Sequence, residues 1–478
     1  MLLIIFDLYR SPEPDENGYA NPISSHLWFQ RQRWWYKLVH VCRLWRCLIL
    51  ASPSRLDLNL FYTHGVPVED MLEHWHSPPL PLIIYFSDRD RDVTEKTEAG
   101  ILLALSPRYR DRVHHIYIFM PNAVFGPRKL IKVMDGHFPI LKSMYFHSDA
   151  KEVFPATFNA PNLRCLSLAT ASLPNQSPLL TTAAGLVTLE FYEIPEAAYF
   201  PPSYLLTQLP LIPQLERLSI GFDRPLNIDV ERQQLHTEIT LPNLRWFSFL
   251  GTSAYLEGLV GRISAPSLRN LHVYLFHQFP FTFPRLLRFM KSSENIRFNA
   301  AEINFDIFGV TVSLEVDPSE VWFKHPPVDP ALDLVIICRE FDLQIASAAQ
   351  ILDMLSPVLS VVERVTLSQG ENGHRQLSDA EWHDHVNRTQ WRNILRHFNN
   401  ATALRVQDEF VGMISHSLLQ SEDEELRLEL LPNLQQVGYS GEGHCLDPFI
   451  AFVNERQLAG HPVNLILLDR SSLDDSED

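Results

Sequence analysis

The stretch Ala160-Pro161-Asn162-Leu163-Arg164-Cys165-Leu166-Ser167-Leu168 decides how this chain folds. Its leucines stand at positions i, i+3 and i+5. The final step of two residues is typical of a half-buried strand, and the proline ends the helix or loop before it. One unit of this kind cannot bury its own apolar face, so the pattern predicts that similar units stack beside it.

The same signature recurs along the chain, and its first positions are separated by 28, 22, 23, 29, 29 and 24 residues. The copies are Val113/Ile116/Ile118, Leu141/Met144/Phe146, Leu163/Leu166/Leu168, Leu186/Leu189/Phe191, Leu215/Leu218/Ile220, Leu244/Phe247/Phe249 and Leu268/Leu271/Val273. Such intervals are those of leucine-rich repeats. The sequence therefore predicts an α/β solenoid, in which strands of successive repeats pair with one another.

The repeats are degenerate, and the signature fades between Phe276 and Ser356. The Asn or Cys that usually follows a leucine-rich strand is missing at its expected offset. An irregular, partly open horseshoe is therefore expected. The fading region is interpreted as a continuation of the stack with longer insertions. The signature returns at Val362/Val365/Leu367, Ala401/Leu404/Val406 and Leu434/Val437/Tyr439.

A second informative stretch runs from Trp35 to Pro53 near the start of the chain. Its apolar residues recur at three- and four-residue steps, which predicts one amphipathic helix that ends before Pro53. The stripe comprises Leu38, Val41, Cys42, Trp45, Leu48 and Ile49. Periodicity alone favours an ordinary core helix with a basic outer face, and a docking helix is the alternative.

The order of residues in this stretch resembles the F-box-like segment of a large fungal family of F-box proteins, of the basidiomycete type. The matching positions are Trp35, Leu38, Val39, Val41, Cys42, Arg43, Trp45, Arg46, Ala51, Ser52 and Pro53. Leu2 to Arg10 looks like the tail of the first F-box helix, without the usual Leu-Pro-x-Glu start, so either a truncated or a degenerate F-box is expected. The resemblance implies a small helical domain that docks on the Skp adaptor of a cullin-type ubiquitin ligase.

The resemblance also implies which residues lie at the adaptor interface or support it. They are Leu3, Phe6, Leu38, Val41, Cys42 and Trp45. The rest of the chain would then select a protein substrate through the exposed strand face of the solenoid. The rival hypothesis is a leucine-rich-repeat interaction scaffold without any link to a ubiquitin ligase.

The charge, the cysteines and the apolar runs of the chain argue against several classes of function. The formal net charge of −17 over 478 residues argues against nucleic-acid binding, which needs a basic surface. The five cysteines form no C-x-x-C pair, so neither a disulfide framework nor a zinc site is expected. No apolar run approaches the ~18 residues of a membrane helix. We expect an intracellular protein, cytoplasmic or nuclear, that needs no cofactor or metal and binds no membrane.

No motif for catalysis stands out. Neither a G-x-S-x-G elbow nor an H-E-x-x-H pair nor a phosphate-binding glycine loop is present. His383 and His385 are two residues apart, which points them in different directions on a helix, and His444-Cys445 is only a sequence neighbour pair. The chain is therefore expected not to be an enzyme. Its expected domains are an F-box-like segment at 1–56, the solenoid at 57–470 and an acidic tail at 471–478.

Overall fold

The structure is a computed structural model of the whole chain. It describes residues 2, 6, 34–52, 56, 58–62, 69, 71–72, 80–87, 95–120, 126–149, 151–174, 177–225, 238–277, 281–293, 295–316, 330–370, 385–419, 430–440 and 447–468. The chain divides into two compact units. Unit 1 comprises Met1–Phe200 with Leu211–Leu215, and unit 2 comprises Pro201–Pro210 with Glu216–Asp478.

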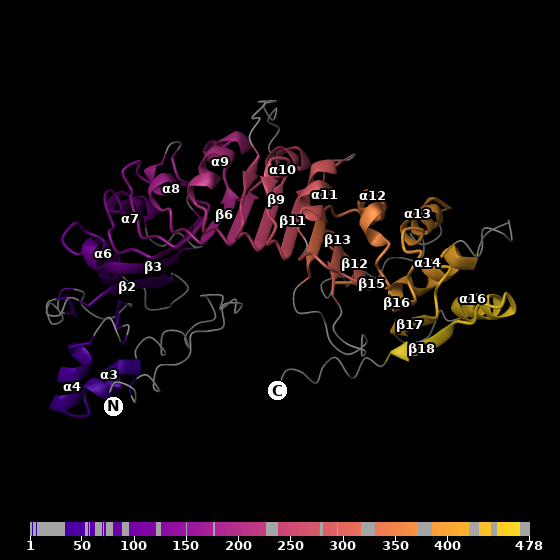
Figure 1. Cartoon of the computed structure of the whole chain (residues 1–478), viewed down its shortest axis with the longest axis horizontal. Coiled ribbons are helices and arrows are strands. Elements are labelled where there is room, and N and C mark those ends of the chain that lie inside the picture. The colour runs from indigo at the N-terminus through magenta and orange to yellow at the C-terminus, as the bar shows by residue number, and fades with distance from the viewer. Residues whose placement is uncertain are drawn as a thin grey trace. The chain divides into compact units, whose positions relative to one another are not determined.

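Unit 1 contains a parallel sheet in which each strand pairs with the next along the chain. Its strands are β1 (Leu60–Tyr62), β2 (Leu82–Ser87), β3 (Val113–Met120), β4 (Ser143–Ser148), β5 (Cys165–Ala169) and β6 (Thr188–Ile194). Its helices include α6 (Glu95–Ala104), α7 (Pro127–Val133) and α8 (Pro178–Thr182), and short 3-10 turns lie at η2 (Arg110–Arg112) and η3 (Glu196–Ala198). In Figure 1, α7 and α8 lie on one side of the strands.

Alternate residues of each strand point toward the helices and form the core. Every residue of the repeat signature in both units is buried, with at most 8% of its surface exposed. The residues between them point away from the helices, and we call their side of each sheet the outward face. This alternation confirms the predicted repeat strands, because a step of two residues places one set of side chains on one face.

Asparagine side chains form hydrogen bonds between successive repeats. They stand before the first leucine of a repeat, whereas the usual asparagine of a leucine-rich repeat follows the strand. Asn162 stands just before the first leucine of its repeat, and its side-chain amide donates to the Pro139 carbonyl of the previous repeat, at 2.5 Å. Asn433 donates to the Asn399 carbonyl in the same way, at 3.0 Å. In these degenerate repeats, the turn carbonyl therefore accepts its hydrogen bond from an asparagine that precedes the strand.

Unit 2 also contains a mainly parallel sheet. Along the sheet its strands are β7 (Arg217–Phe222), β9 (Trp246–Gly251), β11 (Asn270–Phe276), β14 (Leu332–Ile337), β13 (Gly309–Glu315), β12 (Ala300–Asp306), β15 (Arg364–Gln369), β16 (Ala403–Gln407), β17 (Gln436–Ser440) and β18 (Asn464–Leu468). A second, two-stranded parallel sheet pairs β8 (Ile239–Thr240) with β10 (Ile263–Ser264).

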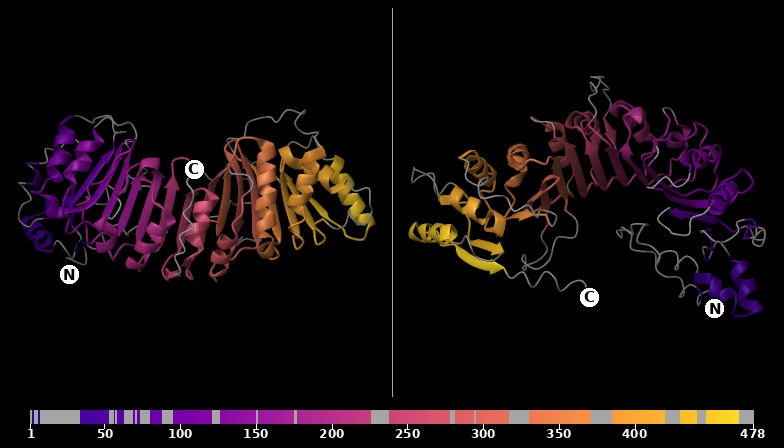
Figure 2. Two further views of the ribbon diagram at one scale, coloured as in Figure 1. Left: turned by 90° about the horizontal axis from the view of Figure 1, so that it is seen from above. Right: turned by 180° about the vertical axis from the view of Figure 1, so that it is seen from behind.

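Helices of unit 2 lie along one face of its large sheet, as α10 to α12 show in Figures 1 and 2. They are α9 (Pro202–Gln208), α10 (Ser253–Val260), α11 (Pro284–Lys291), α12 (Phe341–Leu359), α13 (His385–Leu395), α14 (Asp408–Leu419) and α16 (Asp447–Leu458), with a 3-10 turn at η4 (Leu209–Leu211). Proline occupies the first position of several helices, where its missing N–H has no partner to lose.

The region where the signature fades contains a reversal of strand order. β12 and β13 form an antiparallel hairpin, and β13 then pairs antiparallel with β14. As a result β14 lies beside β11, whereas β12, which comes earlier in the sequence, lies beside β15. The interpretation as a simple continuation of the stack misses this inversion, although the strands predicted at 301–307 and 331–338 are present.

Glycine at the start of β13 makes the hairpin possible. A Cβ on Gly309 would lie 2.1 Å from the carbonyl oxygen of Ile336, which belongs to the backbone of β14. The turn itself is fixed by Asp306, whose carboxylate accepts from the Phe308 N–H at 3.3 Å. Only a residue without a side chain allows β13 and β14 to approach this closely.

The stretch from Trp35 to Pro53 forms two helices, so the prediction of a single helix is wrong. α3 (Trp34–Val39) and α4 (Arg43–Leu50) are separated by an extended residue, Cys42. The Cys42 Sγ accepts from the Trp45 N–H at 3.4 Å, and Arg46 Nε donates to the Val39 carbonyl at 3.0 Å. These two hydrogen bonds pair a backbone N–H at the start of α4 and a backbone carbonyl at the end of α3, which have no partner within their own helices.

Over the described part of the chain, no helix combines the length and the apolar character needed to cross a membrane.

Candidate functional site

Four of the six residues predicted to contact the adaptor lie in α3, α4 or the turn between them, namely Leu38, Val41, Cys42 and Trp45. Phe6 is fully buried and packs edge-to-face on Trp45, with ring centroids 5.0 Å apart. Leu38 is 7% exposed, whereas Trp45 is only partly buried. Phe6, Leu38 and Trp45 therefore support this segment from within, and Leu3 lies outside the described residues.

The exposed apolar residues of this segment surround the break between α3 and α4. Val41 is 58% exposed and Leu44 is 59% exposed. Cys42 is also exposed, and its thiol caps α4. The predicted stripe is thus divided, because Val41 faces solvent while Leu38 and Ile49 are buried.

Leu44 was absent from the predicted stripe because a single continuous helix points it elsewhere. Because α3 and α4 are separate helices, they do not share one continuous stripe, and Val41 and Leu44 are both exposed. Both side chains would be removed from water if a partner covered this segment, which is favourable for apolar surface. We refer to Val41 and Leu44 as the N-terminal apolar pair.

The outward face of the unit 2 sheet carries a second feature, a continuous row of polar residues on adjacent strands. Strand register places them opposite one another in the order Ser219, Ser248, His272, Asp333, Ser313, Glu302, Thr366 and Arg405. We call these residues the polar row. Each strand of the sheet, parallel or antiparallel, contributes one such residue, about 4.8 Å from the next.

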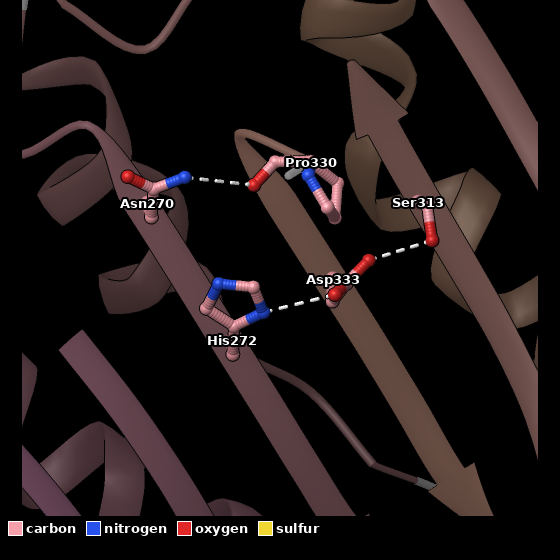
Figure 3. Close-up of polar contacts among 5 residues, drawn as sticks. All are labelled: Asn270, His272, Ser313, Pro330 and Asp333. Carbon is pink, nitrogen blue, oxygen red and sulfur yellow. Dashed lines mark hydrogen bonds and ion pairs between the residues drawn. The ribbon is translucent and has the colours of Figure 1, made fainter. Parts of the chain in front are cut away.

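Three members of the polar row form a chain of hydrogen bonds, shown in Figure 3. His272 Nδ1 lies 2.9 Å from Asp333 Oδ2, and the Ser313 hydroxyl donates to Asp333 Oδ1 at 2.6 Å. The His272 side chain is 8% exposed and that of Asp333 is 16% exposed. Above them, Asn270 donates its side-chain amide to the Pro330 carbonyl at 3.1 Å and holds the start of β14 beside β11.

Aromatic and cationic groups extend this chain toward β7. The Trp246 ring stacks on His272, with centroids 4.2 Å apart and planes 26° apart. The Arg217 guanidinium lies over Trp246, 4.6 Å from the ring centroid. Contacts of this kind fix each side chain in place, so neighbouring strands present a rigid, preorganised surface.

A similar satisfied pair lies further along the sheet. The Ser368 hydroxyl donates to Glu302 at 2.5 Å. Burial lowers the pKa of Arg405, and the nearby Glu302 carboxylate partly offsets that effect. Glu302 thus interacts with residues of two other strands of the same sheet, Ser368 on β15 and Arg405 on β16.

The polar row does not have the geometry of a hydrolytic triad. In such a triad the histidine lies between the carboxylate and the nucleophile. Here Asp333 lies between His272 and Ser313, so the hydroxyl donates directly to the carboxylate. Moreover, His272 Nε2 is buried and has no hydrogen-bond partner in the described part of the chain. The arrangement is suited to holding a surface in shape.

The repeat signature does not single out these residues, although the sequence contains one signal for them. Trp246 and Arg217 stand two positions after the first residue of their repeats, and His272 stands four positions after its own. Those are the outward positions of the signature. Large polar or aromatic side chains there mark the face that a solenoid presents, but Asp333 comes from a repeat whose signature had faded.

Other candidate groups can be placed only in part. His383, Asp384, His444 and Cys445 lie outside the described residues. His385 begins α13, and its side chain is among those not described. Within the described ranges, no cluster of three or more His, Cys, Asp or Glu side chains could hold a metal ion.

Comparison with known proteins adds one distant likeness. No protein-family model matches the chain, and no curated protein matches it significantly. A solved structure that it resembles is the leucine-rich repeat-containing protein LegL7 from Legionella pneumophila, with 12% sequence identity and a TM-score of 0.26. The match covers 87% of this chain and 92% of that chain. The leucine-rich-repeat-like character of the fold rests on the strand register and burial described above.

Proposed function

We propose that this chain is a non-enzymatic recognition subunit, which binds a Skp-type adaptor through α3 and α4 and a protein substrate through its repeat sheets. The repeat fold fits an interaction scaffold, because stacked repeats expose a long, continuous strand face. The observation that carries the adaptor half is the N-terminal apolar pair, Val41 and Leu44, which are more than half exposed.

Several features support this assignment of roles. Phe6 is fully buried and packs against the partly buried Trp45, so the N-terminal segment has a small interior that supports the exposed pair. Exposed apolar side chains on such a surface gain free energy when a partner covers them, about 1.5–3 kcal/mol for a fully buried Val or Leu. The polar row offers a preorganised surface for the substrate half.

A repeat scaffold without a ubiquitin-ligase link is the second candidate. The repeat sheets, with their ordered outward residues, are common to both proposals. Only adaptor binding distinguishes the two, so the test must address the N-terminal apolar pair and leave the repeats unchanged.

The test is capture of the host's Skp adaptor by purified full-length chain, compared with the Val41→Asp and Leu44→Asp variants. We expect native chain to retain the adaptor and each variant to lose at least about tenfold in affinity, because a carboxylate would have to be desolvated at the interface. Far-ultraviolet circular dichroism should be unchanged, since both positions face solvent.

The matched control is Val153→Asp, which makes the same substitution at a residue that is 50% exposed in the repeats of unit 1. It should bind the adaptor as the native chain does. Equal adaptor retention by Val41→Asp, Leu44→Asp and Val153→Asp would remove the assigned role of the N-terminal apolar pair. No retention by the native chain would favour the plain scaffold.

A further inference from the structure

The outward face of the unit 1 sheet is aromatic, unlike the polar row of unit 2. Strand register places Tyr85, Tyr117 and Tyr145 opposite one another on β2, β3 and β4. Two positions further along the strands, Phe119 lies opposite His147. Aromatic residues thus occupy neighbouring outward positions in two rows.

The rings of this face are in contact. Tyr117 stacks on Tyr145, with centroids 4.8 Å apart and planes 10° apart. Phe119 and His147 are also 4.8 Å apart. Cross-strand aromatic pairs of this kind hold one another in a fixed orientation and form a rigid contact area with little conformational entropy to lose.

The outward rings are not part of the core. Inward neighbours such as Ile116 and Met144 are fully buried, whereas Tyr117 and Tyr145 are only partly buried, and Tyr192 on β6 is 40% exposed. Tyrosine is enriched at protein-binding sites because a large apolar ring carries a hydroxyl that can pair with polar groups.

This face carries no positive charge of its own. The strands β2 to β6 contain no lysine or arginine. Burial, assisted by neighbouring His114 and Lys142, lowers the pKa of His115 to about 3, so that imidazole is neutral at physiological pH. Burial also raises the pKa of Tyr117 and Tyr145, which keeps their hydroxyls protonated. By contrast, unit 2 strands carry Arg217, Arg364 and Arg405.

Carboxylates lie on this face and at the carboxyl ends of its strands. Glu190 is outward and partly buried in the middle of β6, in the same cross-strand row as Tyr145 and two residues before Tyr192. Glu193 follows Tyr192 and is exposed. Asp149, just after β4, is exposed as well. Lys142 and Arg164 come just before β4 and β5, at the opposite ends of the strands, whereas Lys151 lies two residues after Asp149 and is exposed. The carboxyl-end rim therefore combines aromatic rings with the carboxylates of Asp149 and Glu193, which outnumber Lys151.

The backbone at this rim adopts a costly conformation. Thr170, just after β5, has a φ of 59°, and Glu193 has a φ of 52°. The two are neighbours, because Ala169 pairs with Tyr192 and the Thr170 N–H donates to the Tyr192 carbonyl at 3.0 Å. Left-handed backbone is unfavourable for non-glycine residues, and such residues cluster at functional sites.

We propose that this rim, comprising Phe119, His147, Asp149, Glu190, Tyr192 and Glu193, binds a basic, extended segment of a protein partner. The aromatic residues supply the contact area, and the carboxylates pair with its arginine or lysine side chains, whose cations also favour ring faces. The net charge of −17 draws such a segment to the chain. This inference deepens the recognition half of the proposed function and does not depend on the adaptor half.

The experiment measures binding of a fluorescently labelled, alternating glycine–arginine peptide to the full-length chain by anisotropy, with a glycine–glutamate peptide of equal length beside it. We expect only the arginine peptide to bind. Tyr192→Ser should weaken it about tenfold, and Glu190→Gln should weaken it and reduce its dependence on salt.

Matched controls distinguish binding of the peptide at the rim from non-specific electrostatic attraction to an acidic protein. Tyr274→Ser removes a tyrosine that is 37% exposed on the outward face of unit 2, and Glu216→Gln removes a carboxylate that is 43% exposed in unit 2. Both should bind as the native chain does. The inference is overturned if the arginine peptide does not bind, or if Tyr192→Ser and Glu190→Gln bind no more weakly than these controls.

The same assay distinguishes failure of this inference from failure of the adaptor proposal. The Val41→Asp chain should bind the arginine peptide as tightly as native chain does, whatever its affinity for the adaptor. Loss of peptide binding by Val41→Asp would contradict the assignment of the basic segment to the rim of unit 1 strands.

Discussion

Replacing Gly309 by alanine is expected to destabilise unit 2 by about 3 kcal/mol or more, at the upper end of the cost of overpacking. The added Cβ would lie 2.1 Å from the carbonyl oxygen of Ile336 and 3.2 Å from Cα of Ile337. Both atoms belong to the backbone of β14, which cannot rotate aside as a flexible side chain can. β13 and β14 must therefore separate at the pair Gly309↔Ile337, where the order of the sheet reverses.

The measurement is chemical denaturation of the full-length variant, followed by far-ultraviolet circular dichroism. Gly412→Ala is the matched control, because Gly412 lies in α14 of the same unit and a Cβ there meets no atom within 4 Å. Alanine in a helix is favoured over glycine, so this control should be neutral or more stable by up to about 1 kcal/mol. A Gly309→Ala variant as stable as the control would contradict the close pairing of β13 with β14.

Replacing Asp333 by alanine is expected to cost about 2–4 kcal/mol of unfolding free energy, because each buried polar group left without a partner costs about 1–3 kcal/mol. The substitution removes the acceptor of the Ser313 hydroxyl and the partner of His272 Nδ1. His272 is 8% exposed, so water cannot easily replace the carboxylate. Packing of Trp246 on His272 should loosen in consequence.

Asparagine is the informative control at this position. Its amide oxygen can accept from Ser313 and its N–H can donate to His272, so Asp333→Asn should lose less than half as much stability as Asp333→Ala. Tryptophan fluorescence during denaturation reports both variants. Equal losses for Asp333→Ala and Asp333→Asn would mean that the charge of Asp333, rather than its hydrogen bonds, matters for the polar row.

The repeat strands could be predicted from the sequence because their signal is local. Leu163, Leu166 and Leu168 fall within six residues, and the two-residue step fixes which side chains face the core. The signature therefore identified buried residues as far apart as Val113 and Tyr439. The proline-containing leads marked the turns before the strands in the same local way.

Topology could not be predicted, because strand order depends on distant pairing. The signature gives each strand but not its neighbour, and the antiparallel insertion of β13 between β14 and β12 depends on the Gly309 approach to Ile336. His272 and Asp333 meet for the same reason, although 61 residues separate them. No periodic pattern connects two residues across an inversion of this kind.

The prediction of one helix in the N-terminal segment is wrong for a different reason. Three- and four-residue spacing from Leu38 to Ile49 is compatible with one helix, and periodicity does not reveal a break. The break depends on a cap made by the Cys42 thiol and on a bond from Arg46 to Val39. It determines that Val41 and Leu44 are exposed while Leu38 is buried.

Titration calorimetry of the purified full-length chain with the purified Skp adaptor decides whether the chain is a recognition subunit, because it needs no other ligase component. We expect saturable binding of one adaptor per chain, with a negative heat-capacity change from burial of the N-terminal apolar pair. No binding at concentrations well above the micromolar range, by a chain whose circular dichroism shows it to be folded, would contradict the recognition-subunit proposal.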